Sequence, residues 1–326
     1  MERIACVSID LDALRHYAAI HGLTASSLPP EAEEAVATKA PPRLGELLRA
    51  VGAPGTFFAV GDDLLPGPGD PAGGEAPVPP RPGARALREA TQAGHEIGNH
   101  TLHHRYDLVR LPAKRLAAEV EGGARAIAEA VGVRPTGFRA PGYTLTAPLL
   151  RAVVEAGHSY DSSSFPAAPY YLAKAGVMGA MRLSGRRSGA ILDRPRVLAA
   201  PPLPYRPSVD EPYARGELPL VELPIATEPV TRLPFIGTTA VSLPIPALRA
   251  LYLAVRRRPF LNLELHGVDL LDQSDGAGEP LARRQRDLRL PAAAKLERLR
   301  ALLGWLADDY RLTTLADAAR AFAGRL

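Results

Sequence analysis

Three of the eight histidines lie within five residues in the stretch "EIGNHTLHH", which runs from Glu96 to His104. His100 and His104 are four residues apart, and on a helical turn this spacing brings both rings to one side. Two imidazoles and one carboxylate are the ligand set of a catalytic Zn²⁺ or related ion that keeps one coordination position open. Thr101 stands where an HExxH protease carries glutamate, so that chemistry is disfavoured. The alternative for the segment is a solvent-exposed loop that happens to be rich in histidine, with His103 packed or hydrogen-bonded.

A carboxylate for such a site is offered by "SIDLD" near the N-terminus, where Leu11 separates Asp10 from Asp12. Residues two apart on a strand share a face, so both carboxylates are predicted to enter one pocket. Two close carboxylates repel each other unless they share a cation or one is protonated. Taken alone, the pair fits a turn or a helix cap at the strand end better.

Three further stretches, "FRAPGY", "YDSSSFP" and "LELH", end predicted strands with polar residues. Arg139 and Asp161 are expected to pair across the pocket, and His266 has the near-neutral pKa that suits an acid or a base. Singly, each of these residues also fits a structural ion pair or a buried core histidine.

The elements that must position these residues alternate along the chain. The predicted strands are "RIACVSIDLD", "GTFFAVG", "HEIGNH", "TGFRAPGY", "HSYDSS", "PFLNLELHG" and "RLTTL", and amphipathic helical segments separate most of them. This alternation predicts a parallel, barrel-like α/β architecture, with the polar residues at the carboxyl ends of the strands. Residues 66–82 read as a Pro/Gly-rich loop insertion, and residues 166–259 as an irregular insertion with many prolines.

The composition of the chain argues against some classes of function. The net charge is +4, but the basic residues are dispersed and have no interleaved aromatics, which argues against nucleic-acid binding. Cys6 is the single cysteine, so an intramolecular disulfide is excluded, and it is expected in the core. Neither a secretory leader nor an apolar run long enough to span a bilayer is evident, so we expect a cytoplasmic protein. "IPALRALYLAVRRRPF" fits a membrane-surface helix or, as we prefer, a barrel helix with arginines at its carboxyl end.

The ordered motifs "SIDLD", "HTLHH", "RAPGY", "DSSS" and "LELH" resemble those of the NodB-homology polysaccharide deacetylases of carbohydrate esterase family 4. The resemblance extends from Ser8 to about Leu315. It implies a distorted (β/α) barrel of the NodB-homology type and a single domain over residues 1–326. It also implies a divalent cofactor, Zn²⁺ first, with Co²⁺, Ni²⁺ or Mn²⁺ as alternatives.

The resemblance further implies a role for each motif residue. The metal ligands would be Asp12, His100 and His104. Asp10 would be the general base and His266 the acid that protonates the leaving amine. Arg139 would hold Asp10, and Asp161 would hold Arg139. Around the substrate, the backbone amide of Gly142 would stabilise the oxyanion, Tyr143 would supply a ring, and Leu263 and Leu265 would form an apolar wall for the acyl methyl group.

Two departures from the family pattern matter. Its first motif usually has adjacent aspartates, whereas the D-x-D form here resembles a branch with intracellular peptidoglycan-deacetylase-like proteins and the deformylase of lipid-linked aminoarabinose. The roles of Asp10 and Asp12 are therefore open to exchange. Gly142 replaces an aromatic residue of many members, which suggests a more open subsite.

The function implied is metal-dependent removal of an N-acetyl or N-formyl group from an amino sugar. The substrate would be lipid-linked, nucleotide-linked or part of a cell-envelope glycan, met in the cytoplasm or at the inner membrane face. The alternative is a catalytically silent glycan-binding member of the same fold. A glycosyltransferase that holds a metal–nucleotide sugar through D-x-D explains only Asp10 and Asp12, so it ranks last.

Overall fold

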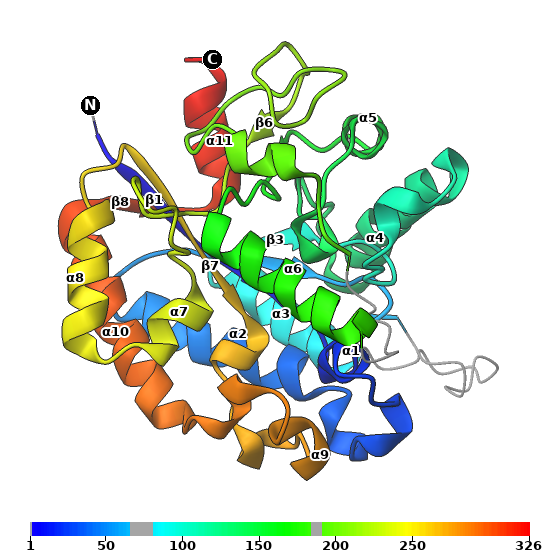
Figure 1. Cartoon of the computed structure of the whole chain (residues 1–326), viewed down its shortest axis with the longest axis vertical. Helices are drawn as coiled ribbons and strands as arrows, with labels where there is room; N and C mark the ends of the chain where they lie inside the picture. The colour runs from blue at the N-terminus through cyan, green and yellow to red at the C-terminus, as the bar shows by residue number, and fades with distance from the viewer. Residues whose placement is uncertain (1, 66–80, 184–190) are drawn as a thin grey trace.

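The computed structural model of the chain describes residues 2–65, 81–183 and 191–326 (Figure 1). Its strands are all parallel and run in the order β6-β5-β4-β3-β2-β1-β7, with β8 paired to β1. Their bounds are β1 Ile4–Asp10, β2 Thr56–Ala59, β3 Glu96–Asn99, β4 Gly137–Phe138, β5 Tyr160–Asp161, β6 Val221–Glu222, β7 Phe260–His266 and β8 Arg311–Thr313. A hydrogen bond from Ala226 N to Asn262 O, 3.0 Å long, links the segment after β6 to β7. The predicted barrel-like α/β fold is confirmed.

The α-helices connect these strands and cover the sheet. They are α1 Leu14–Ile20, α2 Ala35–Arg49, α3 Pro82–Gln92, α4 Ala113–Val131, α5 Ala147–Glu155, α6 Ala168–Leu183, α7 Gly237–Ser242, α8 Ile245–Val255, α9 Glu279–Ala282, α10 Ala292–Asp309 and α11 Leu315–Ala323. Thr146 caps α5, because its side chain accepts a hydrogen bond from Leu149 N, as the sequence predicts. None of the described helices is both long and apolar enough to cross a membrane.

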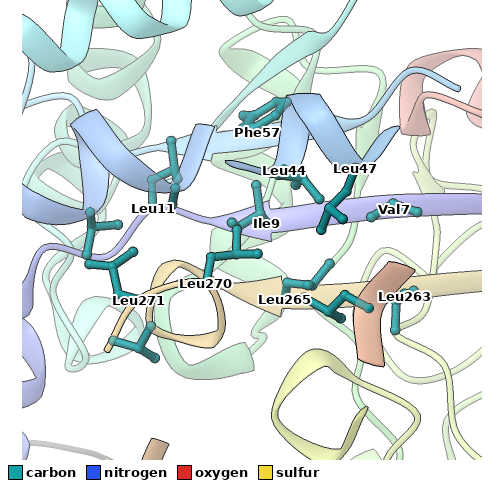
Figure 2. Close-up of a cluster of buried hydrophobic side chains, with 14 of the residues drawn as sticks. Val7, Ile9, Leu11, Leu44, Leu47, Phe57, Leu263, Leu265, Leu270 and Leu271 are labelled. Atoms are coloured by element: carbon teal, nitrogen blue, oxygen red, sulfur yellow. The ribbon is translucent and has the colours of Figure 1, made fainter. Parts of the chain in front are cut away.

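Alternation along the central strands separates the core from the site. The odd-numbered residues of β1 and β7 point outward into the main apolar core, where Val7, Ile9, Leu263 and Leu265 pack with Leu44 and Leu47 of α2 (Figure 2). The even-numbered residues point into the barrel. Near the amino ends of the strands these are apolar, including Ile4 and the buried Cys6, and α11 covers them there. Near the carboxyl ends they are polar, and they form the site.

Helix α8 settles the role of the predicted segment "IPALRALYLAVRRRPF". Its apolar residues Leu248, Tyr252 and Val255 are fully buried in the main core, and Tyr252 donates a hydrogen bond to Trp305 O at 2.6 Å. This face of α8 therefore covers the barrel, as the preferred interpretation of the segment predicts.

The expectation of an irregular insertion over residues 166–259 is wrong in part. This segment contains the barrel strand β6 and the helices α6, α7 and α8, and α7 packs against β7 and α10. The two-residue β6 is too short for an alternating pattern to show in the sequence, which explains why it was not predicted. Of the predicted loop at 66–82, residues 66–80 lie outside the described residues, and Pro82 already begins α3.

Candidate metal centre and hydrolytic site

The predicted metal ligands come together at the carboxyl ends of β1 and β3. Asp12 Oδ1 lies 3.2 Å from His100 Nε2 and 3.1 Å from His104 Nε2. All three side chains are buried, and their candidate donor atoms lie within 4.8 Å of one another. Burial alone would raise the pKa of Asp12, but the two imidazoles outweigh it and hold that pKa well below its usual range. The cluster has the composition and spacing of a site for a divalent cation.

The two histidines are not on a helical turn, contrary to the sequence-based expectation. They lie in the loop after β3, where Thr101 and His104 adopt positive φ angles of 69° and 51°. Asn99 fixes this loop by accepting a hydrogen bond from Thr101 N and donating one to Val120 O. The loop also needs Gly123 of α4, because a Cβ there would lie 2.4 Å from Asn99 Oδ1. A side-chain clamp, and not helix periodicity, brings the two rings to one side.

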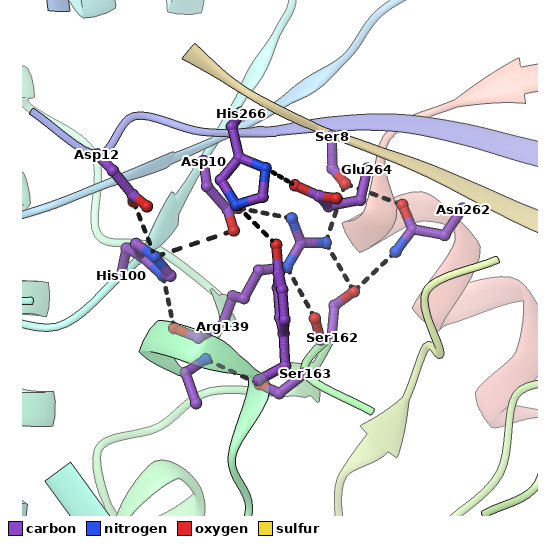
Figure 3. Close-up of polar contacts among 12 residues, drawn as sticks. Ser8, Asp10, Asp12, His100, Arg139, Ser162, Ser163, Asn262, Glu264 and His266 are labelled. Atoms are coloured by element: carbon purple, nitrogen blue, oxygen red, sulfur yellow. Dashed lines mark hydrogen bonds and ion pairs between the residues drawn. The ribbon is translucent and has the colours of Figure 1, made fainter. Parts of the chain in front are cut away.

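Hydrogen bonding around the cluster leaves the ligand atoms available. His100 Nδ1 and the Arg139 carbonyl oxygen are 2.8 Å apart, so Nδ1 carries the proton and Nε2 faces Asp12 (Figure 3). Asp12 Oδ1 and both ring nitrogens of His104 are buried without a hydrogen-bond partner. Buried polar atoms without partners are costly, and a cation held by these residues would remove that cost. His103 lies outside the cluster, with Nδ1 at 2.9 Å from Glu119 Oε1.

Asp10 is held beside this cluster by Arg139. Arg139 Nη1 donates to Asp10 Oδ1 at 2.6 Å, and the other oxygen of Asp10 lies 3.9 Å from His100 Nε2. The guanidinium also donates to Ser162 O, Ser162 Oγ and Ser8 Oγ, and it lies 4.2 Å from the centre of the Phe58 ring (Figure 3). Burial opposes the charge of Arg139, but Asp10 and Glu264 outweigh it and raise its pKa. This network fixes one carboxylate oxygen of Asp10 and leaves the other facing the cluster.

Asp161 does not hold Arg139 as the sequence-based interpretation required. The hydrogen bonds of Arg139 within the described chain go to Asp10, Ser8 and Ser162, while Asp161 accepts from the backbone and hydroxyl of Ser163. Burial is the main cause of raised pKa values at both Asp161 and its fully buried neighbour Glu222. Asp161 therefore orders the serine loop that supplies acceptors to Arg139, and its effect on Arg139 is indirect.

His266 lies opposite Asp10, its register partner at the end of the neighbouring strand. Its Nδ1 is 3.1 Å from Glu264 Oε1, and its Nε2 is 3.0 Å from the Tyr143 hydroxyl. Burial alone would lower the pKa of His266, but the charges of Glu264, Asp12, Asp10 and Asp269 raise it to about 9. His266 is therefore a cation at neutral pH, which is the form a proton donor needs.

Glu264 is a site residue that the sequence analysis missed. It is fully buried, its carboxylate makes an ion-pair contact with His266 but no hydrogen bond of good geometry, and burial raises its pKa to about 7. The alternation in "LNLELH" carried the signal, because Asn262, Glu264 and His266 share one face of β7. A charged residue in phase with a site histidine should have been assigned to the site.

The same alternation rules out the proposed apolar wall of Leu263 and Leu265. Both are 1% exposed and pack in the outer core on the opposite face of β7 from His266 (Figure 2). Gly142 and Tyr143 do line the pocket, in a turn where both have positive φ angles of 67° and 60°. This turn directs the Tyr143 ring toward His266.

The pocket that joins these residues has a volume of about 370 Å³. Its floor is formed by Asp10, Asp12, His100 and His266. Its wall is formed by α1, Tyr106 and α6, with Tyr17, Ile20, Tyr170, Ala173, Lys174, Val177, Met178 and Met181. A polar reactive floor thus adjoins a mainly apolar wall.

Comparison with known proteins agrees with this arrangement. Residues 33–160 match the family model described as polysaccharide deacetylase, a range that contains "HTLHH" and "RAPGY". The match covers less than half of the chain, and it shows that this part resembles the polysaccharide deacetylases. No curated protein sequence matches the chain at a significant level.

Solved structures with a similar fold cover nearly the whole chain. A structure from Mycobacterium smegmatis assigned as a polysaccharide deacetylase is 20% identical, with a TM-score of 0.59 over 99% of this chain and 91% of that chain. Puue allantoinase is 18% identical, with a TM-score of 0.55 over 99% and 91%. A carbohydrate esterase family 4 pseudoenzyme from Bacillus anthracis is 10% identical over 98% and 66%, and its TM-score of 0.49 is too low to bear on function. At these identities the likeness extends to the fold alone.

Proposed function

We propose that the chain is a metal-dependent hydrolase that removes an N-acetyl or N-formyl group from an amino sugar. The observation that carries the proposal is a cluster of three buried ligand residues, two of which line one pocket together with a held carboxylate and a cationic histidine. The match to the polysaccharide deacetylase family supports the reaction class.

The residues present fit a divalent cation. Asp12, His100 and His104 would hold it, and two nitrogen ligands with one oxygen ligand favour Zn²⁺, with Co²⁺, Ni²⁺ and Mn²⁺ as alternatives. Such an ion would supply Lewis-acid chemistry, since it polarises a carbonyl and makes water a stronger acid. We assign the ligand role to Asp12 and not to Asp10, because Asp12 Oδ1 contacts both histidines whereas Asp10 is bonded to Arg139.

The remaining chemistry would be performed by Asp10 and His266, whose side chains lie close together in the pocket floor. Asp10 would accept a proton from the attacking water as its oxygen bonds to the acyl carbon, while Arg139 keeps the carboxylate oriented. His266, held by Glu264, would then donate a proton to the amine nitrogen as the carbon–nitrogen bond breaks. The backbone amide of Gly142 would donate to the oxyanion.

The pocket wall bears on the choice among the candidate substrates. Eight aromatic, aliphatic and lysine side chains from α1 and α6 line one side of the pocket. The C–H faces and acyl methyl groups of a polysaccharide would cover them less completely than an apolar chain. This wall supports a lipid-linked amino sugar over a cell-envelope glycan. Such a substrate would be met at a membrane surface, for which the inner face is our proposal.

The test is release of free amine from a panel of N-acetyl and N-formyl amino-sugar glycosides by the Zn²⁺-supplemented protein, with acetate or formate measured in parallel. Asp10→Asn is expected to lower turnover by roughly 10²- to 10⁴-fold, because it removes the general base. The variant should keep about one ion per chain, as measured by metal analysis, since Asp10 is not a ligand. A parent protein that binds both metal and glycan but releases no amine would support the silent-binder alternative instead.

A further inference from the structure

One cation lies within the otherwise apolar wall of the pocket. Lys174 projects from α6 into the pocket and is partly buried. Burial lowers its pKa to about 8, although Asp193 acts in the opposite direction. The ammonium is therefore mostly protonated at neutral pH.

Lys174 has no anionic partner within the part of the chain that the structure describes. Its Nζ donates only a long hydrogen bond to Gly142 O, at 3.4 Å, and lies 5.7 Å from the centre of the Tyr170 ring. The nearby Asp193 is engaged elsewhere, because its carboxylate accepts from the Tyr213 hydroxyl and from Leu145 N. Partial removal of an ammonium from water without a counter-charge is unfavourable, so a ligand that brings an anion would be favoured here.

The apolar surface beside Lys174 continues from the pocket to the outside of the molecule. Within the pocket it includes Val177, Met178 and Met181 of α6. No residue of α6 is buried, and Leu172 and Val177 are 66% and 61% exposed. Lys174 and Arg182 are the two charged residues of this 16-residue helix, which crosses the front of the barrel in Figure 1. An apolar chain that leaves the pocket past Lys174 would therefore meet an apolar surface.

We propose that Lys174 and the adjoining face of α6 form a subsite for the phosphate ester that links the amino sugar to an apolar carrier. This inference rests on the proposed function, since the sugar must present its N-acyl group to the floor of the same pocket. Lysine binds phosphate as a point charge, and Lys174 is the one charged side chain in the α6 part of the pocket wall. A nucleoside diphosphate has the same anionic chemistry but no chain for the α6 surface.

The experiment compares three substrates that carry the same N-acyl amino sugar: a methyl glycoside, a short-chain isoprenyl phosphodiester and a nucleoside diphosphate conjugate. The parent is expected to hydrolyse the isoprenyl phosphodiester with a kcat/KM at least about tenfold above that of the other two. Lys174→Met should raise KM about tenfold for both phosphorylated substrates and by a clearly smaller factor for the methyl glycoside. Arg182→Met is the matched control, since it removes the other cation of α6, and it should change neither value. Met178→Ser should affect the isoprenyl substrate alone.

Each other outcome has a definite meaning. If Lys174→Met impairs the methyl glycoside equally, Lys174 acts by holding Gly142 and the subsite is overturned. Preference for the nucleotide conjugate keeps the phosphate contact but overturns the apolar carrier. If the parent hydrolyses none of the substrates, the proposed function fails, and calorimetric binding of the isoprenyl phosphodiester to parent and Lys174→Met tests the subsite separately. Equal affinities of the two proteins would then overturn it.

Discussion

The floor of the pocket and its α6 wall are built in opposite ways. Asp10 and His100 of the floor, and Arg139 beside it, are at most 1% exposed and come from the ends of three strands. Hydrogen bonds and ion pairs join these residues (Figure 3). The wall is one helix without a buried residue, and its surface is mainly apolar. The residues whose positions must be precise are thus held by the strands of the sheet. The contacts that we propose for substrate selection lie on α6, which contributes little to the core.

The largest expected effect comes from breaking the floor. His100→Ala removes one of three predicted ligands, so we expect loss of the bound divalent ion and a fall in turnover of more than about 10³-fold. Metal analysis of the purified parent and variant is the direct measurement. His103→Ala is the matched control, because that histidine lies in the same loop but contacts Glu119 outside the cluster. Equal metal content in parent and His100→Ala would contradict the ligand assignment.

The second prediction contrasts the core face of β7 with the wall. Leu263→Ala leaves a cavity in the main core and should lower the free energy of unfolding by about 2–5 kcal/mol. Val177→Ala removes a side chain that is 61% exposed, so its effect on stability should stay within about 0.5 kcal/mol. Chemical denaturation measures both. A similar loss of unfolding free energy in the two variants would show that α6 is part of the stable core.

Features of the fold and the site could be predicted from the sequence where the residues that define them are close together along the chain. The strands and the floor residues were predictable, since buried runs such as "IACVSID" and the motifs at their ends are contiguous. The partner of Asp161 was not, because Glu222 lies 61 residues further along, on a strand of two residues. Leu263 and Leu265 were assigned to the wrong side although strict alternation separates them from His266. Lys174 gave no motif at all, since a lone lysine in an alanine-rich helix is ordinarily solvated.

The smallest expected effect concerns two residues of the floor, Asp10 and His266. Asp10 is held firmly, whereas His266 is held more loosely. Glu264 is the leading positive influence on the pKa of His266, which is about 9. His266 donates its proton only below that pKa, so hydrolysis should fall as the pH rises through it. Glu264→Gln removes the carboxylate charge, while Asp10, Asp12 and Asp269 still face the ring. The alkaline limb of the kcat profile should therefore move to lower pH by about one unit, with about twofold lower kcat at pH 8.

Glu222→Gln separates this positioning role from a general effect of removing a buried carboxyl group. Glu222 is also fully buried with a raised pKa, but it lies on β6 beside Asp161 and does not line the pocket. Glu222→Gln is expected to lose some stability, yet the alkaline limb of its kcat profile should coincide with that of the parent. Glu264→Asp should move the alkaline limb part of the way back to its position in the parent, because it returns the charge at a slightly greater distance from His266 Nδ1. If the limb stays in place in Glu264→Gln while the imidazole resonances of His266 titrate as in the parent, Glu264 does not hold the acid, and the Tyr143 hydroxyl on Nε2 becomes its main partner.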